Sequence, residues 1–274
     1  MRFGLCASDI RVIEQARDWG YDYVEIGARV LVPFEDARAF APIKARLRAS
    51  GMPIEALAGF IPGSVPIVGP SVDPEQVRCY LETTIGRAAE VGVRVINWGS
   101  AESKRVPPGW PFSRAWEQVE QTAALIADLA AAAGVVVVIE PINPREANLL
   151  YYLPDAVQLA RTIDHPNLRV LVDYYHVMKQ NEPLAHVREA GPWLAHAHTS
   201  DDERRLPCLG DWDQRPFLAA LRAAGYDGRL SFEVRGTDDP TFGPRAVESL
   251  RRMRELAQAV AAAETVPSPG LPAS

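Results

Sequence analysis

Four side chains that can bind a metal ion or move a proton each stand at the end of a short apolar run. They are Glu140 after VVVVI, Asp173 after RVLV, His198 at the end of WLAHAH and Glu233 after LSF. Taken singly, each has an ordinary explanation as a helix cap, a surface ion pair or a hydrogen-bonded core histidine. Four such residues in equivalent positions of four consecutive runs are much harder to explain in that way.

The elements that carry these residues follow a regular alternation of apolar and amphipathic segments. Strands are expected at 2–6, 23–26, 54–57, 93–98, 135–140, 169–173, 193–198 and 229–234. Helices are expected near 8–18, 35–49, 73–91, 113–133, 154–164, 182–190, 213–225 and 243–263. Eight strand-then-helix units in a chain of this length predict a single α/β domain, a (β/α)8 TIM barrel. A doubly wound open sheet would favour a glycine-rich phosphate turn, and neither GxGxxG nor GxxxxGK[ST] occurs.

The carboxyl ends of the strands form the active-site face of such a barrel. The four residues therefore converge there, and three carboxylates with one imidazole cannot stay ionised together without a neutralising partner. A divalent cation bound between them would neutralise these charges. Mixed carboxylate and imidazole ligation suits Mn²⁺, Mg²⁺, Co²⁺ or Zn²⁺. The sequence thus predicts a metal site, with Mn²⁺ as the preferred ion.

The motifs IEPIN, VLVDYYH, HAHTSDDERR and LSFEV, in this order, resemble those of the xylose isomerase-like sugar isomerase/epimerase superfamily. Within it they are most similar to ketose 3-epimerases of the tagatose/psicose type, and the resemblance covers the chain up to its last residues. It implies that Glu140, Asp173, His198 and Glu233 are metal ligands and that the two glutamates carry out the proton transfers.

The resemblance also implies three substrate contacts, namely Glu146, His176 and Arg204. Each lies at the family's spacing, six residues after Glu140, three after Asp173 and six after His198 respectively. The chain departs from the family in loops that contact substrate, at TSDDER, at LPCLG and at PINPRE. Because of these departures, the resemblance does not identify the substrate.

Epimerisation requires that a proton be removed from a carbon next to a carbonyl and returned on the opposite face. A cation can polarise the carbonyl, and Glu140 and Glu233 can serve as the two bases. The same chemistry serves keto-inositol dehydratases, enzymes that cleave oxidised glycosides and hydroxypyruvate isomerases, so these stay as alternatives. An apurinic endonuclease on this barrel needs more histidines than the five present, and we expect no such activity.

Three further charged residues have open roles. Glu25 either reaches the pocket or is a hydrogen-bonded structural residue. His196 lies two residues before His198, on the same strand face, and is expected to pack or to support the ligands. Lys104 is expected to lie in a solvated charged loop.

Composition narrows the cellular setting and the partners. The chain has 274 residues, 47% of them hydrophobic, and a net charge of −6, which argues against a nucleic-acid or anionic-membrane surface. Its three cysteines lack zinc-binding spacing, and its first residues do not read as a signal peptide, so we expect a cytoplasmic protein. A sugar or polyol is the expected partner, with a homodimer or homotetramer expected from the resemblance.

The barrel is predicted over 1–263 and a flexible tail over 264–274.

Overall fold

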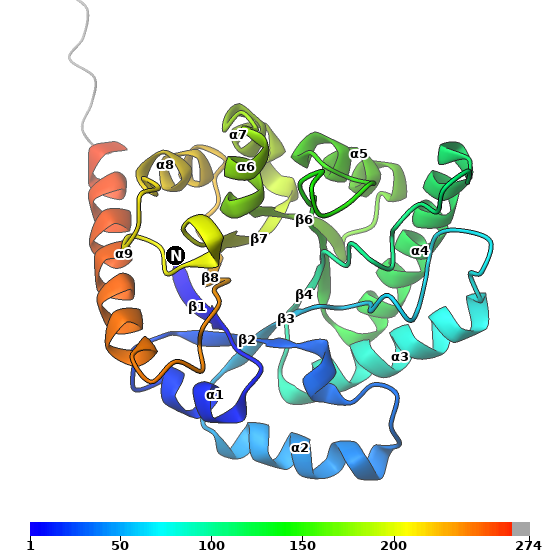
Figure 1. The fold of residues 1–274 in the computed structure, drawn as a ribbon, viewed down its shortest axis with the longest axis horizontal. Helices are drawn as coiled ribbons and strands as arrows, with labels where there is room; N and C mark the ends of the chain where they lie inside the picture. The colour runs from blue at the N-terminus through cyan, green and yellow to red at the C-terminus, as the bar shows by residue number, and fades with distance from the viewer. Residues whose placement is uncertain (265–274) are drawn as a thin grey trace, which may run out of the picture.

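The computed structural model, which describes residues 1–264, is a closed barrel of eight parallel strands in chain order, surrounded by helices (Figure 1). The strands are β1 Arg2–Cys6, β2 Tyr23–Gly27, β3 Ile54–Ala58, β4 Val95–Trp98, β5 Val136–Ile139, β6 Leu168–Asp173, β7 Leu194–Thr199 and β8 Arg229–Phe232. The α-helices are α1 Ile10–Ala16, α2 Ala37–Ala49, α3 Pro74–Val91, α4 Phe112–Ala133, α5 Leu153–Ile163, α6 Tyr174–Gln180, α7 Ala185–Ala190, α8 Arg215–Ala223 and α9 Phe242–Glu264. Short 3₁₀ helices are η1 Ala28–Leu31, η2 Gly191–Trp193 and η3 Asp202–Arg204. The predicted (β/α)8 fold is confirmed.

The alternation of side chains along each strand determines which residues enter the barrel. Val95, Val138 and Leu171 form a small apolar cluster separate from the main core. Because side chains alternate between the two faces of a strand, Glu140 lies on the same face as Val138, and Asp173 on the same face as Leu171. The buried strand therefore delivers its carboxylate to the interior.

The helices begin and end where local chemistry dictates. The Asp73 side chain accepts hydrogen bonds from the backbone N–H groups of residues 75 and 76 and so caps α3, whose first residue is a proline. Gly92 and Gly134 end α3 and α4 with φ of 105° and 67°, a left-handed conformation that costs glycine little. These short connections hold each helix against the strand that follows.

The structure differs from the sequence prediction mainly after β6. The segment 174–180 forms α6, a helix that the apolar pattern did not predict, and the expected helix at 182–190 is reduced to α7. The Asp173 carboxylate accepts from the backbone N–H of Tyr175, so the last residue of β6 is also the cap of α6. The predicted tail at 264–274 lies outside the described residues, apart from the last residue of α9.

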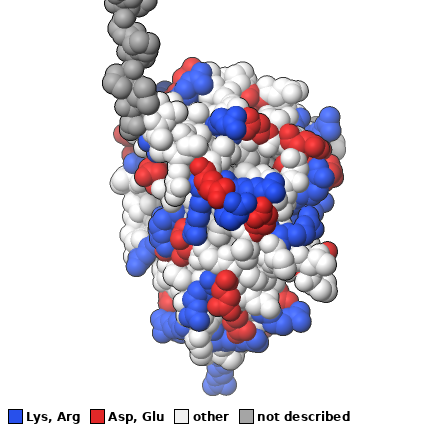
Figure 2. Space-filling view, turned by 90° about the vertical axis from the view of Figure 1, so that its left-hand side faces the viewer, with Lys and Arg blue, Asp and Glu red and all other residues white. Residues whose placement is uncertain are grey.

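Basic and acidic side chains are interspersed on the face that includes α9 (Figure 2). On this helix Arg251 pairs with Glu248 and Glu255, and Arg252 pairs with Glu248. Over residues 1–264, no helix combines the length and apolar character needed to cross a bilayer.

Candidate metal centre and active site

The four residues predicted as ligands come together at the carboxyl end of the barrel. Glu140 follows β5, Asp173 ends β6, His198 lies in β7 and Glu233 follows β8, and one potential ligand atom from each lies within 4.8 Å of the others. The Asp173 and His198 side chains are fully buried, whereas that of Glu233 is 32% exposed. Of these three side chains, that of Glu233 is therefore the nearest to solvent.

The donor atoms fit a divalent cation. Within the described part of the chain, Oε1 of Glu140 and Nδ1 of His198 are buried without a hydrogen-bond partner, and Oε2 of Glu233 is buried with Nη1 of Arg204 2.6 Å away. The imidazole Nδ1 lies 3.6 Å from the Glu140 oxygen and 3.4 Å from the Glu233 oxygen. Buried polar atoms without hydrogen bonds are uncommon and call for an explanation. A divalent ion would satisfy the Glu140 oxygen and the His198 nitrogen, and the Glu233 oxygen beside them is a third donor of the same kind.

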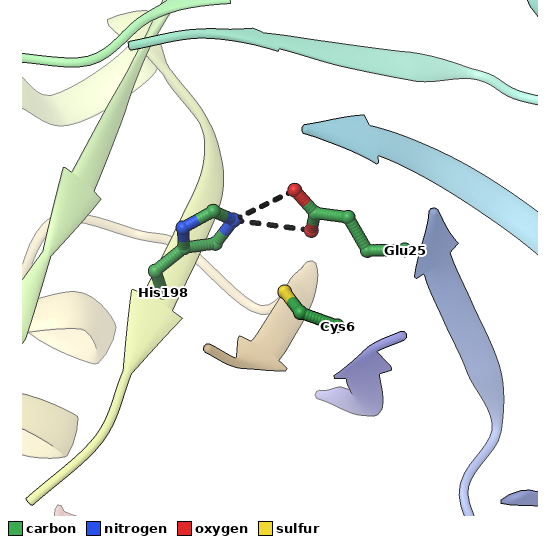
Figure 3. Close-up of side chains that lie close together, drawn as sticks. All are labelled: Cys6, Glu25 and His198. Carbon is green, nitrogen blue, oxygen red and sulfur yellow. Dashed lines mark hydrogen bonds and ion pairs between the residues drawn. The ribbon is translucent and has the colours of Figure 1, made fainter. Parts of the chain in front are cut away.

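The Glu25 carboxylate holds the His198 ring at the nitrogen that faces away from the cluster. The imidazole Nε2 lies 3.0 Å from both carboxylate oxygens of Glu25, so the ring directs Nδ1 toward the cluster (Figure 3). A carboxylate on the far nitrogen of a ligating histidine fixes the tautomer and raises the basicity of the ring. Glu25, whose role the sequence left open, thus belongs to the site as a support for His198.

Glu25 also links β2 across the barrel interior to β7 and β8. It accepts a hydrogen bond of 2.7 Å from the Ser231 hydroxyl and lies 2.8 Å from Nε2 of His196. Burial would raise the pKa of Glu25, but the two histidines outweigh it and hold that pKa well below its ordinary value. Glu25 therefore carries a buried negative charge, and His196 has the supporting role expected of it.

Cys6 ends β1 beside this pair (Figure 3). One ligand atom from each of Cys6, Glu25 and His198 lies within 4.8 Å of the others. Burial, and then Glu25, raises the pKa of the thiol well above its ordinary value, which disfavours the thiolate that a metal needs. The facing atoms of Glu25 and His198 already pair with each other, so we interpret this group as support for His198.

Arg204 supplies the positive charge nearest the cluster. Its Nη1 lies 2.6 Å from an oxygen of Asp173 and 2.6 Å from one of Glu233. Although burial raises the pKa of Glu233, Arg204 and then His198 bring it below its ordinary value. Burial dominates at Asp173, whose pKa is raised. The predicted substrate contact Arg204 therefore lies in direct contact with two predicted ligands.

His176 and Glu146, the other two predicted substrate contacts, are joined by a residue that sequence reasoning did not single out. The Asn143 amide lies 2.8 Å from Nδ1 of His176 and donates to a Glu146 oxygen at 2.9 Å. His176 is buried with Nε2 3.6 Å from Asp173, whereas Glu146 is exposed. The sequence signal was present, since Asn143 lies three residues after Glu140 in the quoted PINPRE.

Lys104 contradicts its expected place in a solvated loop. It is only 2% exposed, and its Nζ donates to the Trp98 carbonyl oxygen at 3.1 Å. Burial lowers the pKa of Lys104 to about 7, although the nearby Glu140 charge opposes the shift. Glu140 itself accepts a hydrogen bond of 2.7 Å from the Asn97 amide, which supports this glutamate.

Comparisons with known proteins identify the family of the chain. A family model described as xylose isomerase-like TIM barrel matches residues 13–256. A 3-dehydro-D-guloside 4-epimerase of Escherichia coli K12 is 25% identical over 82% of this chain and 86% of its own. A D-psicose 3-epimerase of Agrobacterium fabrum is 26% identical over 81% of this chain and 77% of its own. The crystal structure of a D-psicose 3-epimerase in the presence of D-fructose superposes with a TM-score of 0.81 at 19% identity, over 94% of this chain and 99% of that one.

Proposed function

The chain belongs to the xylose isomerase-like TIM barrel family, and on that premise we propose that it is a divalent-metal-dependent sugar epimerase. The two relatives share one reaction type, because a 3-dehydro sugar inverted at carbon 4 and a 2-ketose inverted at carbon 3 both react next to a carbonyl. The proposed substrate is therefore a ketose or an oxidised glycoside. The predicted enzyme class, an isomerase or epimerase, has the support of these relatives.

The observation that carries the proposal is the pair of glutamates on either side of one histidine nitrogen. Glu140 and Glu233 come from strands three places apart in the ring, and their oxygens lie 3.6 Å and 3.4 Å from Nδ1 of His198. Two carboxylates that reach one point from separate strands can contact opposite faces of a substrate held between them. Inversion of a carbon centre needs that arrangement.

Glu140, Asp173, His198 and Glu233 would hold the cation. When bound, the cation would polarise the substrate carbonyl and stabilise the negative charge that develops on its oxygen. The remaining steps belong to the chain's own residues. One glutamate takes the proton from the carbon, and the C–H electron pair moves into the carbonyl to give an enediolate. The other glutamate, as its acid, returns a proton to the opposite face, and the carbonyl forms again.

The neighbouring residues would position the substrate. Arg204 and His176 lie next to Asp173 and can hold a substrate oxygen. Asn97 holds Glu140 at its second oxygen, and the first lies 3.6 Å from Nδ1 of His198. Glu146, exposed at the edge of the site, would contact the distal end of the substrate.

Deuterium incorporation tests the proposal. The Mn²⁺-loaded protein is incubated in D₂O with free ketoses, 3-keto glycosides, keto-inositols and hydroxypyruvate, and exchange is followed by NMR. The expected result is the epimer, deuterated at the carbon next to the carbonyl, for a ketose or a keto glycoside. Glu233→Gln and added chelator should abolish the exchange, and Glu55→Gln, at the far end of the barrel, should leave it intact. Elimination without an epimer would make the protein a lyase, and no exchange on any compound would overturn the proposal.

A further inference from the structure

Arg204 lies between β7 and α8, in a segment of residues 201–212 that we call the Arg204 loop. Its guanidinium contacts Asp173 and Glu233, but its backbone has an unusual conformation. Glu203 and Arg204 have φ of 54° and 56°, in the left-handed region that is unfavourable for residues with a side chain. Such conformations persist where the surrounding structure enforces them, and they gather at functional sites. Other contacts must therefore stabilise this backbone.

The Asp201 side chain closes the base of the Arg204 loop. It is fully buried, and its carboxylate accepts hydrogen bonds from the backbone N–H groups of Asp202 at 2.8 Å, Asp211 at 3.2 Å and Trp212 at 3.3 Å. The first of these N–H groups lies at the start of the loop and the other two lie at its end. One carboxylate thus joins the two ends of the segment that carries Arg204.

The backbone of the loop is gathered tightly around this carboxylate. A Cβ at Gly210 would lie 2.4 Å from Cγ and Oδ1 of Asp201, so the packing leaves no room for a side chain there. The Asp201 N–H donates to the carbonyl oxygen of Arg205 at 2.8 Å, and the Arg235 N–H donates to that of Arg204 at 2.8 Å. These bonds involve none of the four proposed metal ligands.

An ion pair does not account for the burial of Asp201. The Arg205 guanidinium is 3.9 Å from an Asp201 oxygen and its side chain is half exposed, so this pair contributes little. Burying a carboxylate costs free energy unless hydrogen bonds replace the lost water. The bonds that Asp201 accepts come from the backbone of its own loop, and the carboxylate therefore serves the conformation of that loop.

We propose that Asp201 is a positioning residue that fixes the Arg204 loop in the conformation that directs Arg204 into the site. Without this carboxylate the two ends of the loop lose their common acceptor, the left-handed residues relax, and the guanidinium moves away from the substrate. The catalytic part rests on the proposed epimerase function, in which Arg204 holds a substrate oxygen. The conformation of the loop does not depend on that function.

Trypsin reads this conformation without a substrate. The carbonyl groups of Arg204 and Arg205 both accept backbone hydrogen bonds, so the peptide bonds after them can be cleaved only when the loop opens. In the Mn²⁺-loaded protein, cleavage at these two bonds should be roughly 10-fold or more faster in Asp201→Ala than in wild type. Mass spectrometry of the fragments measures the rate at each bond.

Three further variants sharpen the cleavage experiment. Asp201→Asn keeps one acceptor oxygen and should be cleaved at a rate between those of wild type and Asp201→Ala. Gly210→Ala keeps the carboxylate but crowds it, and should also be cleaved faster. The matched control is Asp73→Ala, which removes an acceptor of two backbone N–H groups at the start of α3 and should be cleaved at the wild-type rate.

Equal cleavage rates in wild type and folded Asp201→Ala would overturn the proposal. If Asp201→Ala does not fold, Asp201→Asn decides, because a rate equal to that of wild type would overturn the proposal and a faster rate would support it.

A double-mutant cycle then tests the link to Arg204. On a sugar that the wild-type protein turns over, Asp201→Ala should lower kcat/KM roughly 10- to 100-fold, because a misplacement of about 1 Å can cost that much. In a protein that already carries Arg204→Ala, the same substitution should have almost no further effect. Asp73→Ala should keep the wild-type kcat/KM.

Additive effects in the cycle would mean that Asp201 acts on stability alone, and would overturn the positioning role. If no sugar is turned over even by wild type, the proposed function fails, while the cleavage rates still decide what holds the Arg204 loop.

Discussion

Charged residues gather at both ends of the barrel, but their surroundings differ. At the amino end Arg2 begins β1, Arg229 begins β8 and Glu55 lies near the start of β3. Arg2 contacts a Glu55 oxygen at 2.6 Å, and Arg229 contacts the same carboxylate at 2.7 Å. Partial burial raises the pKa of Glu55, yet the two arginines bring it below its ordinary value. Arg2 and Arg229 therefore share one oppositely charged neighbour.

At the carboxyl end three carboxylates surround one histidine, and Arg204 contacts two of them. Oxygen and nitrogen atoms stay buried without hydrogen bonds, and the buried amine of Lys104 donates to a backbone carbonyl oxygen. Such arrangements lower stability and persist at functional sites. The amino end therefore stabilises the barrel, whereas the carboxyl end is organised for binding and reaction.

Removing one proposed base should have the largest effect. Glu233→Gln keeps the size of the side chain but cannot accept a proton, so kcat should fall roughly 1,000-fold or more, about 4 kcal/mol. Initial rates on the sugar identified by deuterium exchange measure this. A decrease of less than tenfold in folded protein would show that Glu233 is not a base.

Lys104 should make stability depend on pH. The ordinary pKa of lysine is 10.5 and that of Lys104 is about 7, so between these values the unfolded chain binds more protons than the native one. Stability should therefore rise with pH across that window, by up to about 1.4 kcal/mol per pH unit. Lys104→Met should remove this dependence and stabilise the protein by up to about 4 kcal/mol at neutral pH or below.

Urea unfolding at about pH 6 and about pH 9 checks the Lys104 prediction. Lys44→Met is the control, because Lys44 lies at the surface and pairs with Glu90. This variant should keep the wild-type pH dependence. A Lys104→Met protein less stable than wild type at both pH values would show that the buried amine is a favourable contact.

Glu25→Gln should weaken metal binding although it replaces none of the four proposed ligands. It removes the negative charge behind His198, and loss of such a supporting carboxylate costs roughly 10- to 100-fold in affinity, about 1.4 to 2.7 kcal/mol. Calorimetric titration with Mn²⁺ gives the value. Ser231→Ala, which keeps the carboxylate and removes one of its hydrogen bonds, should have a smaller effect. Equal affinities for Glu25→Gln and wild type would contradict the role assigned to Glu25.

Glu55→Gln should have the smallest effect, and on stability alone. Both arginines would lose the charge that they share, and the free energy of unfolding should fall by about 1 to 2 kcal/mol. Chemical denaturation measures this change, and kcat should stay at the wild-type value. A large loss of activity in well-folded Glu55→Gln would remove the distinction between the two ends.

The fold and the four converging residues could be predicted because they depend on local pattern. The VVVVIE run identifies a buried parallel strand, and side-chain alternation then carries Glu140 inward. Helix α6 could not be predicted in this way, since it has seven residues and depends on the Asp173 cap at the end of β6. Whether a residue acts as a ligand or as a support likewise depends on distances across the barrel, which the sequence does not contain.

Glu25 and Lys104 illustrate this limit. Glu25 is separated from His198 by 173 residues, so no spacing rule links them. Lys104 lies in SAESKR, a stretch that reads as a solvated loop, and only tertiary packing buries it against Trp98. Asn143 is the intermediate case, because its position after Glu140 was visible but its three hydrogen bonds were not.

Titration of the metal-free protein with Mn²⁺ tests the central claim, that the carboxyl end holds its charges for one divalent cation. The variant is Asp173→Asn, which keeps an oxygen to cap α6. Its control is Asp22→Asn, at the amino end, where Asp22 pairs with Arg254. We predict one site per chain, an affinity roughly 100-fold or more weaker in Asp173→Asn, and wild-type affinity in Asp22→Asn. No binding to wild type, or equal affinities for wild type and Asp173→Asn, would contradict the account.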